Sequence, residues 1–185
     1  GFSFAVPTLI VQDVTFGGMV HEKPMNQALN EAILKAMGEK MDIHNADIRN
    51  SITSSGLYKV VDEFNDKNES TIITKQSNVA DYTLNGNVIM GSSFENIYDI
   101  PDTNNSTYTK TVSIFVEYQL INNKTHEIAK SFNSNVSGSE TQNFNTNKIH
   151  PEPNLNELLS NLSKNLADNV VVNLKNQKNA TPVTN

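Results

Sequence analysis

Apolar and polar residues alternate with period two over residues 80–90 and again over residues 111–121. This alternation, with many β-branched and aromatic side chains, predicts two half-buried strands. The second strand leads through Asn122-Asn123-Lys124-Thr125 into a similar stretch over residues 126–132. Because the connections are too short for crossover helices, we expect these three strands to be antiparallel neighbours.

Two shorter strands are predicted nearer the N-terminus. Residues 7–16 form the first, which Gly17-Gly18 ends, and residues 57–62 form the second. The pattern over residues 63–79 does not distinguish a short helix from a loop.

Apolar residues recur at spacings of mainly three, four and seven from Met25 to Ile52 and from Leu155 to Leu174. Such spacings predict two helices with one apolar face each. The first has a possible break at Gly38 or at residues 42–45, and Ser54-Ser55-Gly56 ends it.

This order of elements predicts an α+β fold. We expect a two-layer sandwich with a mixed sheet of about five strands and both amphipathic helices on one face. A single domain over residues 5–176 and a disordered tail over residues 177–185 fit the length. The expected core consists of Leu29, Ile33, Leu34, Met37, Val60, Leu84, Val88, Ile114, Val116, Tyr118, Leu158, Leu162, Leu166 and Val170.

The connection over residues 91–110 contains Pro101 and Asn104-Asn105-Ser106 and shows neither period. Long connections without a pattern are usually functional or mobile. We therefore expect a functional or mobile loop between the two alternating strands.

The net charge of −6 and the absence of a Lys and Arg cluster argue against binding to nucleic acid. The chain has no cysteine, which excludes disulfides and thiolate metal sites. No apolar run is long enough to span a bilayer. The chain begins without Met, from which we expect that an export signal has been removed.

The residues that carry chemistry are scattered. Four histidines have no partner at metal-ligand spacing: His21, His44, His126 and His150. Five carboxylates lie on or beside strands, where an acid and base pair is one interpretation and outward strand positions are the expected one: Asp13, Glu22, Asp81, Glu117 and Glu127.

No Gly-x-Ser-x-Gly elbow and no phosphate-binding glycine loop occurs in the chain. Gly86-Asn87 indicates a bulge or a point of close packing in a strand. We therefore expect no catalytic, cofactor-binding or metal-binding residues, and no enzymatic activity.

Three segments together resemble a group of bacterial envelope lipoproteins. They are Ser55-Gly56-Leu57-Tyr58 at the start of a strand, Ala80-Asp81-Tyr82-Thr83-Leu84-Asn85-Gly86, and the hairpin over residues 116–128. This pattern is similar to the penicillin-binding-protein activator LpoB, and the curli secretion protein CsgG and the N-terminal domain of TolB are similar in plan. The group commonly has Thr-Gly-Glu in the hairpin turn, whereas this chain has Thr125-His126-Glu127.

The resemblance implies a non-enzymatic, periplasm-facing lipoprotein domain, tethered to the outer membrane through a lipid anchor outside the given sequence. It implies an envelope protein partner, with a penicillin-binding protein as the expected one, and a role in regulating or scaffolding peptidoglycan synthesis.

Two alternatives stay open: a structural component of a surface, secretion or flagellar assembly, and a small-molecule or glycan-handling enzyme that uses residues 91–110. A deep pocket with convergent polar groups would favour the enzyme, and a flat patch or an exposed sheet edge would favour binding. The sequence leaves the oligomeric state open.

Overall fold

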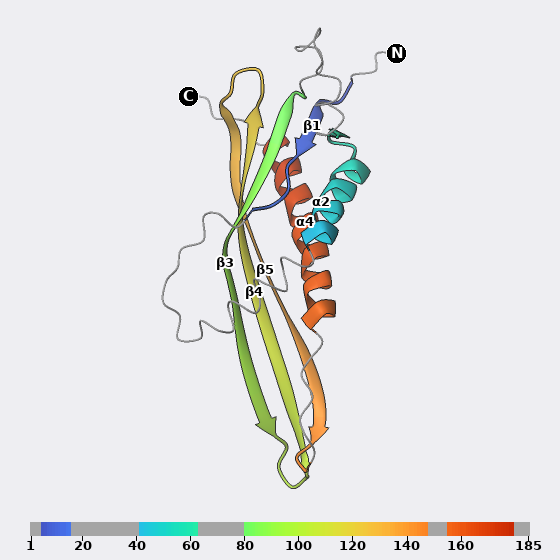
Figure 1. Cartoon of the computed structure of the whole chain (residues 1–185), viewed down its shortest axis with the longest axis vertical. Coiled ribbons are helices and arrows are strands. Elements are labelled where there is room, and N and C mark those ends of the chain that lie inside the picture. The colour runs from blue at the N-terminus through green and yellow to red at the C-terminus, as the bar shows by residue number, and fades with distance from the viewer. Residues whose placement is uncertain (1–4, 16–40, 63–79, 148–154, 180–185) are drawn as a thin grey trace.

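The computed structural model describes residues 5–15, 41–62, 80–147 and 155–179 (Figure 1). The strands are β1 (Thr8–Val11), β2 (Lys59–Val61), β3 (Tyr82–Asp99), β4 (Asn105–Asn122) and β5 (Ile128–Asn145), and the helices are α2 (Met41–Ser55) and α4 (Leu155–Asn179). α4 therefore continues three residues into the segment that was expected to be a tail.

The five strands form one mixed sheet in the order β2-β1-β3-β4-β5. β1 pairs in parallel with both β2 and β3, whereas β3, β4 and β5 are antiparallel neighbours. Both helices lie on the same face of this sheet, and they pack against each other (Figure 1). The predicted α+β sandwich, its mixed sheet and its antiparallel triplet are thus confirmed.

The last three strands are much longer than predicted, with 18 residues each. The loop expected over residues 91–110 is wrong, because β3 continues to Asp99 and β4 already begins at Asn105. β5 likewise continues to Asn145, well past the predicted end at residue 132. Residues 91–110 show no regular alternation of apolar and polar residues. The strands β3 and β4 nevertheless pair without a gap from Met90–Phe115 to Asp99–Ser106.

We call the distal halves of these strands, residues 90–99, 105–115 and 135–145, the extension. The strands continue past the N-terminal end of α4 (Figure 1). A bulge separates the extension from the rest of β3, since the pairing register shifts between Val88 and Met90. At the tip, Asp102 has a positive φ of 63° and the Ile100 N–H donates to the Asn105 carbonyl at 2.9 Å.

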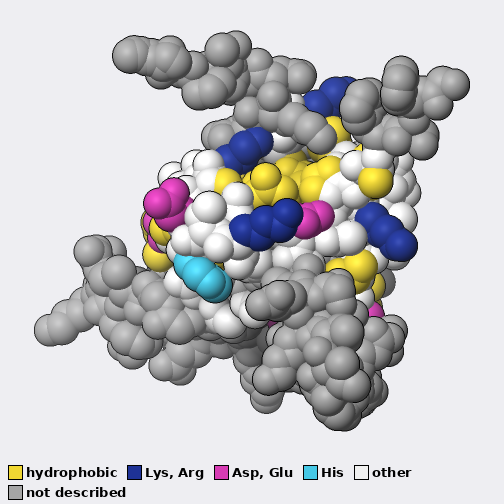
Figure 2. Space-filling model, turned by 90° about the horizontal axis from the view of Figure 1, so that it is seen from above, with side chains coloured by type: hydrophobic (Ala, Val, Ile, Leu, Met, Phe, Trp, Pro, Cys, Tyr) yellow, Lys and Arg dark blue, Asp and Glu magenta, His cyan; other side chains and the backbone are white. Residues whose placement is uncertain are grey.

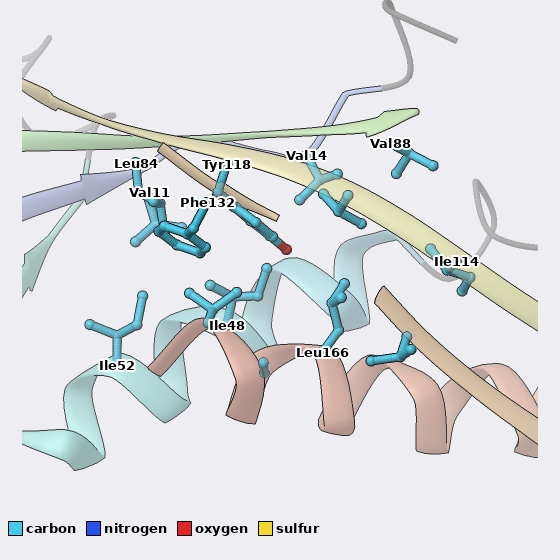
Figure 3. Close-up of a cluster of buried hydrophobic side chains, with 14 of the residues drawn as sticks. Val11, Val14, Ile48, Ile52, Leu84, Val88, Ile114, Tyr118, Phe132 and Leu166 are labelled. Atoms are coloured by element: carbon cyan, nitrogen blue, oxygen red, sulfur yellow. The ribbon is translucent and has the colours of Figure 1, made fainter. Parts of the chain in front are cut away.

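The core lies mainly between the other half of the sheet and the two helices, and it reaches Val112, Ile114 and Val136 of the extension. Figure 3 shows side chains of the sheet pointing toward Ile48 and Ile52 of α2 and Leu166 of α4. Ten of the expected core residues fall within the described residues, of which Val60 is half-buried and the remaining nine are buried. The predictions for Leu29, Ile33, Leu34 and Met37 lie outside the described residues.

Gly86 is a point of close packing, as the sequence predicted. A Cβ atom at this position would lie 2.6 Å from Cε1 of Tyr118, whose ring is buried and stacks on Phe132 with centroids 5.3 Å apart. Only glycine leaves room for that ring.

The end of α2 also agrees with the prediction, because Gly56 follows it with a φ of 74°. Residues 42–45 do not interrupt the helix, so a break there is wrong. Asn45 points inward and its Oδ1 accepts from the backbone N–H of Val14 at 3.1 Å. This buried hydrogen bond gives a polar residue a reason to lie on the inward face of a helix.

Candidate functional site

The histidines do not come together in the described part of the chain. His44 is buried on α2, and His126 is exposed in the turn between β4 and β5. His21 and His150 lie outside the described residues. Within the described ranges, no group of three or more His, Asp or Glu residues could hold a metal ion.

A polar bridge between α2 and α4 was missed by the sequence reasoning. The Oγ of Ser163 on α4 lies 2.8 Å from Nδ1 of His44 and donates to Oδ2 of Asp47 at 2.8 Å. Since that hydroxyl proton goes to Asp47, the Nδ1–H of His44 is the donor to Ser163. The Nε2 of His44 is then an unprotonated acceptor, which is buried and has no hydrogen-bond partner.

The arrangement of His44, Ser163 and Asp47 does not activate the Ser163 hydroxyl as a nucleophile. In a catalytic triad, the imidazole lies between the hydroxyl and the acid and takes the hydroxyl proton. Here the hydroxyl lies between His44 and Asp47, where it accepts from His44 and donates to the Asp47 carboxylate, so the imidazole does not take its proton. Burial also lowers the pKa of His44 from 6.5 to about 4, although nearby Asp47 opposes the shift. The bridge therefore joins two helices and does not activate Ser163.

An apolar cavity of about 40 Å³ adjoins His44. Its lining includes Val88, Ile114, Leu162 and Leu166. A cavity of this size has room for no more than a few water-sized molecules, whereas substrate pockets are several hundred Å³ and present several convergent polar groups. The cavity therefore gives no support to the enzyme alternative.

The carboxylates named from the sequence have separate structural surroundings. Asp13 forms an ion pair with Arg49 at 2.8 Å, and Oδ2 of Asp81 accepts from the backbone N–H of Thr8 at 3.0 Å. Glu117 and Glu127 are exposed. Glu22 lies outside the described residues. Among the four that the structure describes, no two share a hydrogen bond or a common partner in these contacts.

The outer face of the extension, which points away from the helices, is a surface of hydroxyl and amide groups. Three cross-strand hydroxyl pairs join β4 to β5 at distances of 2.7 to 2.9 Å: Thr109 with Thr141, Thr111 with Ser139, and Ser113 with Ser137. A shallow depression of about 310 Å³ on this face is lined by Met90, Ser92, Ser113, Phe115, Asn135 and Ser137.

Large apolar side chains are exposed along the distal half of β3. Met90 is 56% exposed, Phe94 66%, Ile97 50% and Tyr98 56%. Met90, Phe94 and Tyr98 lie on the outer face, whereas Ile97 lies on the inner face, where Tyr108 and Val112 of β4 are buried. Clusters of exposed apolar residues on one element commonly mark an interaction surface. This cluster coincides with the segment that was expected to be functional.

The opposite end of the molecule carries no surface of one charge sign among the described residues. Figure 2 views that end and shows Lys and Arg, Asp and Glu, and hydrophobic side chains intermingled. A nucleic-acid interface would instead gather basic side chains in a patch or stripe.

Similarity to known proteins is limited to fold. No protein-family model and no curated protein matches this chain. Among solved structures, protein XCC0632 from Xanthomonas campestris is 12% identical, with 96% of this chain and 89% of that chain covered and a TM-score of 0.50. At this identity the likeness shows the fold alone.

Two further structures are bacterial lipoproteins. The minor lipoprotein from Acinetobacter baumannii is 8% identical, with 93% of this chain and 94% of that chain covered and a TM-score of 0.45. Lipoprotein GNA1162 from Neisseria meningitidis is 14% identical, with 92% and 99% covered and a TM-score of 0.28. Bacterial lipoproteins are thus among the proteins to which this chain is similar.

Neither helix in the described part of the chain has the length and apolar character needed to cross a membrane.

Proposed function

We propose that this chain is a non-enzymatic, periplasm-facing domain of a bacterial envelope lipoprotein that binds another protein through its extension. The observation that carries the proposal is the extension itself, a three-stranded sheet that continues past α4 and exposes large apolar side chains. Elements that extend from a packed core and keep apolar surface in solvent usually meet a partner.

Two features of the extension suit protein recognition. The outer face offers hydroxyl and amide groups in a regular array, and the shallow depression beside Phe115 offers apolar contact. β5 is the last strand of the sheet within the described residues, and an edge strand is where an extended segment of a partner can add to a sheet. The partner that we propose, from the sequence resemblance, is a peptidoglycan synthase of the penicillin-binding-protein class.

The test compares two matched double substitutions in the full chain. Asn135→Lys with Asn143→Lys places two cations on exposed positions of β5 in the extension. Asn161→Lys with Asn165→Lys makes the same change of charge on exposed positions of α4. Captured envelope proteins are identified by mass spectrometry, and a purified cell-wall synthase or outer-membrane assembly component is then titrated against each variant.

We expect the unmodified chain and the α4 variant to bind the purified partner equally, and the β5 variant to bind at least about tenfold more weakly, because charges on an edge strand oppose strand addition. Added salt is expected to weaken binding where acidic surface contributes. Equal binding by all three proteins, or measured turnover of a substrate that Ser163→Ala abolishes, would contradict the proposal.

A further inference from the structure

On the β3 side of the extension, no strand within the described residues pairs with β3, and we call this side the open edge. β1 pairs with β3 only as far as Leu84, followed by a bridge between Thr15 and Asn87, and no described strand pairs with that side beyond it. Near β1, the carbonyls of Leu84 and Gly86 accept hydrogen bonds from Gln12 and Thr15. The edge beyond this point carries backbone groups of the same kind with no described partner strand.

The backbone groups at this edge follow from strand geometry. Leu84, Gly86 and Val88 bond toward β1 and have their side chains on the inner face. Residues whose side chains share one face of a strand also direct their N–H and C=O groups to one edge. The inner-face residues beyond the bulge therefore present their backbone groups to the open edge: Gly91, Ser93, Glu95 and Ile97.

The outer-face side chains of the same segment have a symmetric order. Met90, Phe94 and Tyr98 are exposed and spaced by four residues, and Ser92 and Asn96 lie between them. The order of apolar and polar side chains on this face is therefore symmetric about Phe94. An antiparallel copy of this strand would meet it with like residues opposite like residues.

We propose that two copies of this chain pair through β3, antiparallel and about a two-fold axis at Phe94. In this register Phe94 lies opposite Phe94 of the second copy, Met90 opposite Tyr98, and Ser92 opposite Asn96. These are non-hydrogen-bonded pairs, whose side chains approach closely, and aromatic pairs at such positions stabilise sheets. The inner-face residues form the hydrogen-bonded pairs.

The inner face supports the same register. Ser93 lies opposite Glu95 of the second copy, and the Ser93 hydroxyl is buried without a hydrogen-bond partner in the single chain. The carboxylate of Glu95 lies 3.5 Å from Nζ of Lys110, which balances its charge. Moving the axis by one residue to Glu95 would oppose two like charges, which destabilises a strand pair.

The alternative occupant, the β5 edge of another copy, suits this strand less well. The outer-face residues of β5 are Ser, Thr and Asn, so they would cover Phe94 and Tyr98 with polar groups. Each exposed ring offers roughly 100–150 Å² of remaining surface, which places the paired copies at the small end of specific interfaces. The pair is therefore a weak, concentration-dependent dimer that does not involve the β5 edge, to which the proposed partner is assigned.

Disulfide trapping tests the register directly, because the chain has no cysteine of its own. In the double variant Ser92→Cys with Asn96→Cys, each cysteine at position 92 lies opposite the cysteine at position 96 of the second copy. The Cα separation of such a pair is within the range that a disulfide requires. Either single substitution places its cysteine about 13 Å from the same cysteine of the second copy, four residues along the strand. We expect the double variant to form a covalent dimer under mild oxidation and both single variants to form no covalent dimer.

Sedimentation equilibrium of the full chain supplies the second measurement. Phe94→Ser should weaken dimerisation at least about tenfold, because it removes both central rings. Val172→Ser, at a 52% exposed position of α4, should leave dimerisation unchanged. A monomer at millimolar concentration, trapping by Asn96→Cys alone, or assemblies larger than a dimer would each overturn the pairing. None of these measurements needs the envelope partner, so failure here does not bear on the proposed function.

Discussion

The two halves of the long sheet are stabilised differently. In the half beneath the helices, Leu84, Val88 and Val116 are buried against α2 and α4, and a close ring packing fixes Gly86. In the extension the inner face still buries Tyr108, Val112, Ile114 and Val136, whereas hydroxyl pairs join the strands on the outer face and large apolar side chains of β3 remain in solvent. The comparison indicates that the first half supplies stability and that the second is built outward for contact with other chains.

The largest expected difference between the halves comes from truncation. Leu162→Ala removes a side chain that is 1% exposed in the core, and should lower the free energy of unfolding by about 2–5 kcal/mol. Thr109→Ala removes one exposed hydroxyl pair of the extension and should cost no more than about 1 kcal/mol. Denaturant unfolding measures both, and equal losses would contradict the division of roles.

The free energy of unfolding should also depend on pH through His44, which lies on α2 in the half of the molecule that contains the helices. Because the folded pKa of His44 is about 4 and its unfolded value is 6.5, the unfolded chain binds the proton first as the pH falls. Stability due to neutral His44 is thus present above pH 6.5 and lost between about 6.5 and 4, by about 3 kcal/mol. His44→Gln should remove this slope, so the stability difference between the two proteins should change with pH. A constant difference would refute the assignment.

Gly86→Ala sharpens the account of the close packing. The new methyl group would meet the buried Tyr118 ring, and we expect a loss of about 1–3 kcal/mol in the free energy of unfolding. Gly138→Ala is the control, since its Cβ would meet only ends of the Leu158 and Leu162 side chains, at 3.1 and 3.0 Å. A larger loss at Gly138 than at Gly86 would show that the Tyr118 ring adapts.

A smaller and opposite effect is expected at the Tyr118 hydroxyl. This group is buried without a hydrogen-bond partner, and burial raises the pKa of Tyr118. Tyr118→Phe removes an unpaired polar group at little cost in volume, so stability should stay the same or rise by about 1 kcal/mol. Thermal unfolding checks this, and a loss above about 1 kcal/mol would reveal a partner for the hydroxyl.

The smallest expected gain in stability comes from a substitution in the turn between β4 and β5. His126 has a φ of 63°, at the position where the resembling proteins commonly have glycine. His126→Gly should stabilise by up to about 1 kcal/mol, because a left-handed conformation strains a residue with a Cβ atom. Asp102→Gly makes the same test at the tip of the extension, where φ is also 63°. A loss of stability in both variants would show that the turns are not strained.

The sequence predicted the half of the sheet that has one apolar face, together with residues 111–115 of β4, and could not predict the rest of the extension. Alternation was visible over residues 80–90 and 111–121 because burial beneath helices requires it. In the extension both faces carry polar residues, and strand structure there depends on pairing between β3, β4 and β5, which a local pattern does not record. Pro101 and Asn104 lie in the tip between β3 and β4, whereas Asn105 already begins β4.

The polar bridge carried a signal that the sequence reasoning overlooked. His44 lies four and eight residues before Ile48 and Ile52, which places it on the buried face of the same helix. Its partner Ser163 is 119 residues away, so only the tertiary structure brings the two together. A histidine on an apolar helical stripe predicts burial, whereas its partner does not follow from spacing.

The most direct test of the account is residue-resolved amide hydrogen exchange along β3 in dilute protein, and again at a concentration at which two copies of the chain pair. We expect slow exchange at outer-face residues bonded to β4, such as Phe94, and fast exchange at the open-edge residues Ser93, Glu95 and Ile97, which then become protected on pairing. Uniformly fast exchange over residues 90–99, or an open edge that stays unprotected in the paired chains, would contradict an ordered extension built for protein contacts.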